Sequence, residues 1–223
     1  MIQILKQMSL VLFNLSIISL SLRADSSPPE GAIHFISDKG VQKMVNEKNP
    51  EQALTWVFSK GVLTATKGHI VTAMPVKNFK AHIEFNVNNN PENPPGNNGN
   101  SGVYIQQRYE IQILNSHGKN ENYSHSDCAS LYKFKKPDKI VCKPAGEWQS
   151  YDIEFHAAKW KDGKKTANAR VTVYHNGVLV HDNVELPGST GHGKAETPEA
   201  LPLRLQHHGN AVKFRNFWLK EIK

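Results

Sequence analysis

Alternation of hydrophobic and polar residues dominates this chain, and helical periodicity is scarce. The clearest alternating run, SGVYIQQRYEIQIL, spans residues 101–114. Its hydrophobic parity consists of Val103, Ile105, Tyr109, Ile111 and Ile113. Its polar parity consists of Tyr104, Gln106, Arg108, Glu110 and Gln112. Because successive strand residues point to opposite faces, the run predicts one face against a core and one lined with hydrogen-bonding groups.

The run reads either as one strand or as a hairpin that turns near residues 106–108. A two-residue turn at Gln106–Gln107 would pair Ile105 with Arg108 and mix hydrophobic and charged side chains. A three-residue loop would pair Ile105 with Tyr109 and preserve both faces. The parity is compatible with one strand or with this three-residue loop.

Similar alternation recurs between turn signals along most of the remaining chain. The other candidate strand regions are 55–65, 80–87, 150–157, 168–182, 201–207 and 211–222. Asn176–Gly177 is the strongest hairpin signal, because this dipeptide tolerates the positive φ angles of a tight turn. Many short strands at such spacing predict an all-β fold, an antiparallel sandwich of two sheets.

The N-terminus carries Lys6, then an apolar run from Leu10 to Leu22, then Ala24. This pattern is typical of a secretory signal peptide. The alternatives are an apolar helix of the fold or a membrane anchor, for which the run is short. We therefore expect a signal peptide over residues 1–24, a single domain over residues 25–223, and export to the periplasm or the extracellular space.

Charge and cysteine content narrow the class of protein further. The formal charge is +7, and removing residues 1–24 leaves 25 basic against 20 acidic residues, or +5. The densest basic run, residues 159–165, has only Trp160 as an aromatic platform, which argues against nucleic acid as a partner. No membrane contact is expected after signal removal. Cys128 and Cys142 would form a disulfide or stay as two separate buried thiols.

A second polar parity follows near the C-terminus. Arg204, Gln206 and His208 alternate with leucines, and Arg215 follows the Gly209–Asn210 turn. Tyrosine, amide, guanidinium and carboxylate groups together match the adjacent hydroxyls of a sugar. We therefore expect the two polar stretches to line one groove, although a polar face can also be simply the solvated side of a sandwich.

Four runs in the same order are similar to one known family: NSGVYIQQRYEIQILNSHG, KPAGEWQSYDIEF, ARVTVYHNGVLVHDNVEL and PLRLQHHGNAVKFRNFWLKEI. The chain resembles the 3-keto-disaccharide hydrolase family over roughly residues 31–222. The resemblance implies a concanavalin-like jelly roll with its site on the concave sheet, and an exported enzyme that cleaves glycosides oxidised at C3. Asn115 and His207 stand where the family usually has an aspartate.

The chemistry of a 3-keto-glycoside suggests roles for these residues. We expect Glu110 to abstract the C2 proton and His208 to be the second proton-transfer group. Arg108 and Arg215 are the candidates to meet the ketone oxygen, and Lys143 is a further one. Elimination of the C1 leaving group and hydration would give net hydrolysis. The expected substrate-binding residues are Tyr104, Gln106, Arg108, Gln112, Lys143, Arg204 and Gln206.

Several alternatives stay open at this point. Glu110 could instead form an ion pair with Arg108 or Arg215. The sequence establishes no cofactor; a divalent metal could act as the electrophile, although no ligand set for one is evident. The whole domain could also be a non-catalytic glycan-binding module, or a structural domain. The oligomeric state is not predicted.

Overall fold

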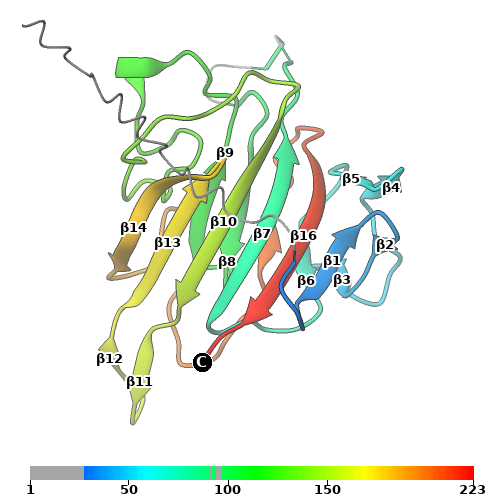
Figure 1. Cartoon of the computed structure of the whole chain (residues 1–223). Helices are drawn as coiled ribbons and strands as arrows, with labels where there is room; N and C mark the ends of the chain where they lie inside the picture. The colour runs from blue at the N-terminus through cyan, green and yellow to red at the C-terminus, as the bar shows by residue number, and fades with distance from the viewer. Residues whose placement is uncertain (1–27, 91, 94–96) are drawn as a thin grey trace, which may run out of the picture.

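The computed structural model describes residues 28–90, 92–93 and 97–223. Two antiparallel sheets pack face to face, which confirms the predicted all-β sandwich (Figure 1). The expected signal peptide, residues 1–24, lies outside the described residues. Within the described part of the chain, no helix is long and apolar enough to cross a membrane.

The larger sheet has nine strands. Seven follow the order β14-β13-β10-β7-β16-β1-β2, β5 pairs with β16, and β4 pairs with β5. Their bounds are β1 (Ile33–Ser37), β2 (Gly40–Val41), β4 (Val57–Ser59), β5 (Val62–Thr64), β7 (Phe79–Asn86), β10 (Trp148–His156), β13 (Ala169–His175), β14 (Val178–Leu186) and β16 (Lys213–Glu221).

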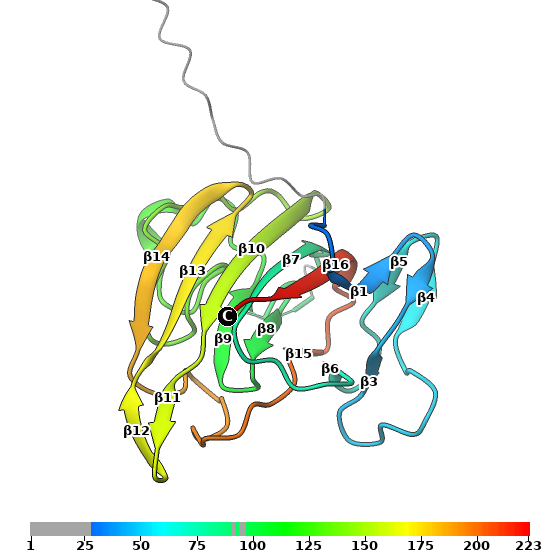
Figure 2. The same ribbon diagram turned by 60° about the horizontal axis from the view of Figure 1, so that its bottom comes forward.

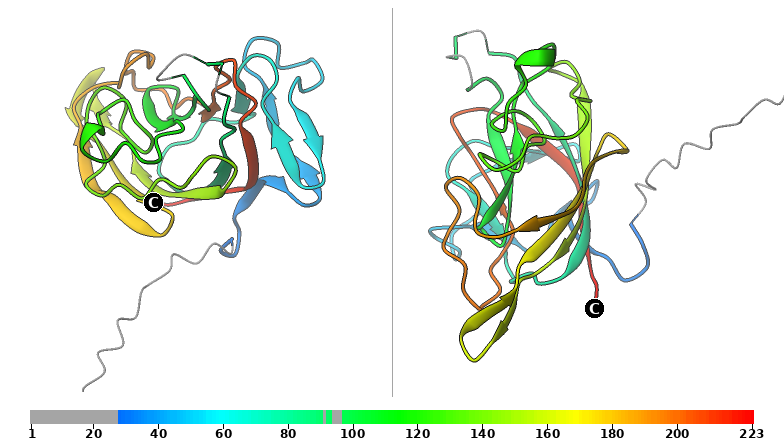
Figure 3. Two further views of the ribbon diagram at one scale, coloured as in Figure 1. Left: turned by 90° about the horizontal axis from the view of Figure 1, so that it is seen from above. Right: turned by 90° about the vertical axis from the view of Figure 1, so that its left-hand side faces the viewer.

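The smaller sheet has five strands in the order β3-β6-β15-β8-β9. Their bounds are β3 (Met44–Asn46), β6 (Ile70–Thr72), β8 (Ser101–Ile105), β9 (Tyr109–Ile113) and β15 (Arg204–Leu205). In Figure 2 the nine-stranded sheet curves around the five-stranded one. A separate hairpin of β11 (Lys159–Lys161) and β12 (Lys164–Ala167) extends beyond the sandwich (Figure 3), and a short 3₁₀ turn covers Asn120–Asn122.

The core lies between the two sheets and is built by the alternation seen in the sequence. Ile83 and Phe85 of β7 and Ile153 of β10 face Val103 and Ile111 of the β8–β9 hairpin across it, all nearly fully buried. Each such side chain contributes about 1.5–3 kcal/mol to folding. The polar residues between them therefore point away from the core, on the outer face of one sheet or the other.

The three-residue loop is the alternative that the structure adopts for the β8–β9 hairpin. Ile105 pairs with Tyr109, and Gln106 and Gln107 hold positive φ angles of 50° and 55°. This conformation is costly for residues other than glycine. Hydrogen bonds offset the cost: the Gln106 side chain donates to Val76 O (2.8 Å) and accepts from Arg108 (2.9 Å).

Two other predictions concern Asn176–Gly177 and the cysteines. His175 pairs with Val178, so Asn176 and Gly177 form a two-residue turn, both with positive φ, as predicted. Cys128 and Cys142 are both buried and free. Burial raises the pKa of the Cys128 thiol, which also hydrogen-bonds with Cys142, so the two thiols are in contact.

Candidate functional site

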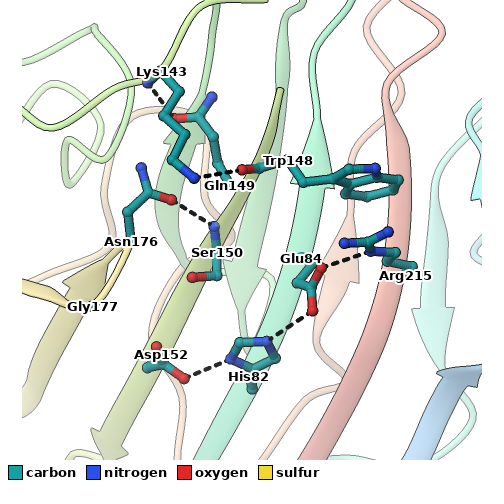
Figure 4. Close-up of a pocket in the computed structure, with 10 residues that line it drawn as sticks. All are labelled: His82, Glu84, Lys143, Trp148, Gln149, Ser150, Asp152, Asn176, Gly177 and Arg215. Carbon is teal, nitrogen blue, oxygen red and sulfur yellow. Dashed lines mark hydrogen bonds and ion pairs between the residues drawn. The ribbon is translucent and has the colours of Figure 1, made fainter. Parts of the chain in front are cut away.

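The predicted site residues fall on two polar surfaces, on opposite outer faces of the sandwich. The first, here called the Glu110 surface, lies on the five-stranded sheet and consists of Tyr104, Glu110, Gln112, Arg204 and Gln206. The second, here called the Arg215 pocket, lies on the nine-stranded sheet. Figure 4 shows this pocket.

Strand pairing places the central residues of the Glu110 surface side by side. Tyr104 of β8 is directly opposite Glu110 of β9, and Arg204 of β15 is opposite Tyr104 on its other side. Directly paired residues on one face have Cβ atoms about 4.5–5.5 Å apart. Two stretches nearly a hundred residues apart in the chain therefore do share one polar face.

The Glu110 carboxyl is buried on this face of the five-stranded sheet. The side chain is buried, with 2% exposure, and its backbone N–H donates to Thr190 Oγ1 (2.7 Å). Burial raises the pKa of Glu110 to about 7, against the opposing effects of the Tyr104 hydrogen bond and the positive charge of Arg204. A carboxyl with this pKa is about half ionised at neutral pH and suits general acid–base catalysis.

Arg204 and Gln206 complete the surface around Tyr104. The Arg204 guanidinium carbon lies 3.9 Å from the centroid of the Tyr104 ring, and Arg204 Nη1 lies 3.4 Å from Glu47 Oε1. The Gln206 amide donates to the Tyr104 hydroxyl (3.3 Å). Burial raises the pKa of Tyr104, with a further rise from the Glu110 charge, so the phenol stays protonated.

Three unsatisfied polar atoms lie on this surface. Glu110 Oε2, Arg204 Nε and Gln206 Oε1 are buried and have no hydrogen-bond partner among the described residues. Because buried polar atoms are nearly always hydrogen-bonded, such orphans point to a missing ligand or water. The surface offers one acceptor of variable charge, one cationic donor and one amide acceptor, a set that can bind a sugar.

Loops that carry no alternating pattern cover the edge of β9. Tyr132 N donates to Glu110 O (3.0 Å), and Gly191 packs so closely on the Tyr132 ring that a Cβ atom there would lie 2.3 Å from Tyr132 Cδ1. Tyr132, Thr190 and Glu47 were not predicted as site residues. Tyr132 and Thr190 lie in irregular segments, and Glu47 follows a short strand, so periodicity gave no signal for any of them.

Gln106, Arg108 and Gln112 mainly anchor neighbouring segments. Arg108 donates to Ala195 O (3.0 Å), Glu199 O (3.0 Å) and Thr197 Oγ1 (2.6 Å), so its guanidinium holds the loop over residues 195–199. Gln112 lies on the Glu110 surface, but its amide donates to Ser126 O (3.4 Å) and accepts from Ile113 N (3.0 Å). Substrate contacts from these three residues stay a prediction.

The structure does not bring Lys143 and Arg215 to the Glu110 surface. Arg215 belongs to β16 of the nine-stranded sheet, and its neighbours Phe214 and Phe217 are in the core. Arg215 therefore points away from the core on the far side, with its Nε 2.6 Å from Glu84 Oε2. The expectation of one groove failed for these two residues because the chain crosses from one sheet to the other between β15 and β16.

His208 lies at the loop end of the five-stranded sheet. Its side chain is exposed, and Nδ1 is 3.0 Å from Asn97 Oδ1. The adjacent His207 contacts His69 through its backbone N–H (3.2 Å), and Asn115 N donates to Asn98 O (2.8 Å). None of these contacts connects His208 with Glu110, and a proton-transfer role for it stays a prediction.

The residues of the Glu110 surface do not fit a metal site. Among the described residues, no group of three or more His, Cys, Asp or Glu side chains is placed to hold a metal ion. The orphaned atoms include a guanidinium nitrogen, which cannot act as a ligand. No step of the chemistry below is therefore assigned to a metal.

The comparisons with known proteins agree with this fold. The 3-keto-alpha-glucoside-1,2-lyase-like domain matches residues 37–220, and the chain belongs to this family of carbohydrate-active proteins. No curated protein sequence matches the chain at a significant level.

Three crystal structures of candidate glycosyl hydrolases from Parabacteroides distasonis ATCC 8503 are similar to it. One is 30% identical with a TM-score of 0.78, and the match covers 87% of this chain and 85% of that one. A second is 18% identical with a TM-score of 0.57, covering 81% and 89%. The third is 23% identical with a TM-score of 0.50, covering 75% and 90%.

Proposed function

We propose that this protein is an exported enzyme that cleaves glycosides already oxidised to a ketone at C3, with Glu110 as the base. The observation that carries the proposal is the Glu110 carboxyl itself. It is buried, its pKa is raised to about 7, and its Oε2 has no partner among the described residues. The family and the hydrolase-like neighbours support a carbohydrate substrate.

The reaction begins at C2, whose proton is acidified by the adjacent ketone. Glu110 Oε2 accepts this proton, and the electron pair of the C2–H bond moves onto the ketone oxygen as an enolate. The unpaired Arg204 Nε donates to that oxygen and stabilises its charge. Oε2 is the carboxyl oxygen assigned to this step because it has no hydrogen-bond partner among the described residues.

Collapse of the enolate then breaks the C1–O bond and expels the aglycone. The leaving oxygen takes up a proton, and an enone with a C1–C2 double bond remains. Water adds across this bond, with hydroxide to C1 and a proton to C2, which completes a net hydrolysis. Release of the enone before water adds would make the same site a lyase.

Glu110→Gln tests the proposal, because the amide keeps the shape and removes the base. General base catalysis contributes about 10²–10⁴-fold, so kcat/KM on 4-nitrophenyl 3-keto-α-glucoside should fall by that factor. Glu154→Gln on the exposed face of β10 is the matched control. Wild-type turnover by Glu110→Gln would remove Glu110 from the proposed role.

A non-catalytic glycan-binding module is the second candidate. The departures at Asn115 and His207 favour it, because each removes a carboxylate that the family usually carries. Calorimetry with 3-keto and unoxidised glucosides, followed by product analysis, separates the two functions. Binding without any released aglycone would establish the module.

Export is tested independently of the chemistry. The expected signal peptide predicts that the mature protein from a bacterial host begins at Asp25 and is found outside the cytoplasm. N-terminal sequencing of the fractionated protein measures both. A cytoplasmic protein that retains Met1 would refute export and leave the catalytic proposal intact.

A further inference from the structure

The Arg215 pocket is a hollow of about 520 Å³ on the outer face of the nine-stranded sheet (Figure 4). Its floor comes from outward-facing residues of β7, β10 and β16, and Lys143, Trp148 and Asn176 stand around it. The hydrophobic core separates it from the Glu110 surface. Any ligand here is therefore bound independently of Glu110.

A chain of ion pairs fixes the floor of the pocket. Arg215 Nε lies 2.6 Å from Glu84 Oε2, Glu84 Oε1 lies 3.7 Å from His82 Nε2, and His82 Nδ1 lies 2.6 Å from Asp152 Oδ1. Burial lowers the pKa of His82, but the two carboxylates outweigh it and raise that pKa to about 9. At neutral pH the floor thus holds two cations and two anions that balance.

Lys143 adds a positive charge that is not balanced. Its ammonium donates to Trp148 O (3.0 Å) and forms no ion pair with a carboxylate in the described part of the chain. Two of its three N–H groups remain available. The pocket therefore carries a net positive charge at a fixed position beside its rim.

A hydroxyl, a carboxylate oxygen and an aromatic ring lie next to this charge. Trp148, Ser150 and Asp152 alternate along β10 and share its outer face, and the Arg215 guanidinium carbon lies 4.0 Å from the centroid of the Trp148 ring. No hydrogen bond holds the Ser150 hydroxyl or Asp152 Oδ2 within the described residues. Successive positions on one strand face are about 6.6 Å apart, close to the width of a pyranose ring.

We infer that the Arg215 pocket is a second saccharide-binding site, which takes an acidic sugar. The carboxylate of the sugar pairs with the Lys143 ammonium. The hydroxyls of the sugar hydrogen-bond to Ser150 and Asp152, and Trp148 contacts the pyranose ring. The ion pairs of the pocket floor orient these side chains, and because their charges balance they do not compete with Lys143 for the sugar carboxylate. A site of this kind would hold the protein on an acidic polysaccharide while the Glu110 surface, on the opposite face, catalyses the proposed reaction of another sugar.

Isothermal titration with trigalacturonate, and with maltotriose as the neutral probe, tests the inference on the full-length mature protein. Trigalacturonate should bind and maltotriose should not, and raising the salt concentration should weaken the binding. Lys143→Met should weaken trigalacturonate binding about 10–100-fold, the loss expected for a hydrogen bond to a charged group. Glu154→Gln, on the same face of β10 but paired with Lys80 outside the pocket, should bind like the wild type.

Ser150→Ala guards against a folding defect, because it removes one hydroxyl that no hydrogen bond holds within the described residues and leaves the ion pairs intact. It should weaken trigalacturonate binding several-fold at an unchanged unfolding midpoint and unchanged turnover of the 3-keto-glucoside. No binding by the wild type, equal binding of maltotriose, or undiminished binding by both variants would overturn the inference. Glu110→Gln should bind trigalacturonate normally, so a failure of the catalytic proposal gives a different result.

Discussion

Gly102→Ala should displace the carboxyl of Glu110, the proposed base, while leaving the fold in place. Gly102 lies in β8 beside Glu110, and a Cβ atom added there would lie 2.4 Å from Glu110 Oε1 and 3.1 Å from Tyr104 Cε2. Ordinary contact begins at 3.4 Å, so the carboxyl must move by about 1 Å. Misplacement of a catalytic group by that distance can cost about 10²-fold in rate.

The stability of this variant should change little, because two effects oppose each other. Pushing the end of the Glu110 side chain off its rotamer costs about 0.5–1.5 kcal/mol. Replacing a strand glycine by alanine stabilises the protein by about 0.4–1 kcal/mol, because it lowers the conformational entropy of the unfolded chain. The unfolding free energy should therefore stay within about 1 kcal/mol of the wild-type value.

Aglycone release from 4-nitrophenyl 3-keto-α-glucoside measures the effect. We expect kcat to fall about 10–100-fold with a smaller change in KM, because the base is misplaced while most sugar contacts persist. Gly188→Ala is the matched control, since nothing lies within 4 Å of a Cβ atom at that loop position. Wild-type kcat in Gly102→Ala, at unchanged stability, would refute the placement of the base.

Three further predictions follow from buried charges. Glu110 has a pKa of about 7 in the folded protein against an ordinary 4.5, so folding is favoured less once the carboxyl ionises. The unfolding free energy of the wild type, measured with urea, should therefore fall by up to about 3 kcal/mol relative to that of Glu110→Gln as the pH rises from 4.5 to 7. A difference between the two proteins that does not change with pH contradicts this. The pKa of His82 is raised from 6.5 to about 9, so its ion pairs stabilise the fold fully below pH 6.5 and this stabilisation is lost as the pH rises to 9. His82→Gln should lower the unfolding free energy by about 3–5 kcal/mol at pH 6. An equally large decrease at pH 9.5 would contradict the raised pKa. Arg108→Lys keeps the charge but loses most of the hydrogen bonds to residues 195–199. It should lower the unfolding free energy by about 2–4 kcal/mol and speed proteolysis of that loop. An unchanged rate of cleavage would show that these hydrogen bonds do not hold the loop.

Alternation along the chain was sufficient to predict most strands and the faces of the central hairpin. The parity of residues 103–113 placed Tyr104 and Glu110 on one face, and the polar parity after Leu203 placed Arg204 there too. These predictions succeed because the period of two is a local property of strands. The same pattern also predicted the correct hairpin at Asn176–Gly177.

Alternation does not encode which sheet a strand joins. Arg204 and Arg215 are close in sequence and each is a basic residue on a strand, yet one lies on the five-stranded sheet and the other on the nine-stranded sheet. That difference depends on the connection over residues 206–212, where Gly209 has a positive φ and Asn210 is held by hydrogen bonds to Asn97 O and His208 O. The expectation that Arg204 and Arg215 line one groove failed because the fold places their strands in different sheets.

The positions of the two surfaces follow from one constraint on the core. Ile111 must point inward from β9, so Glu110 and Gln112 point outward from the five-stranded sheet; Tyr151 must point inward from β10, so Ser150 and Asp152 point outward from the other. One hydrophobic core lies behind both polar surfaces, and Tyr151 of β10 reaches across it to donate to Gln112 O (2.6 Å). Because the intervening core separates them, substitutions on one surface can change its ligand without altering the electrostatics of the other. Under the two proposals made above, one face of this sandwich would hold an acidic sugar and the other would act on a 3-keto-glycoside, each with its own set of charges.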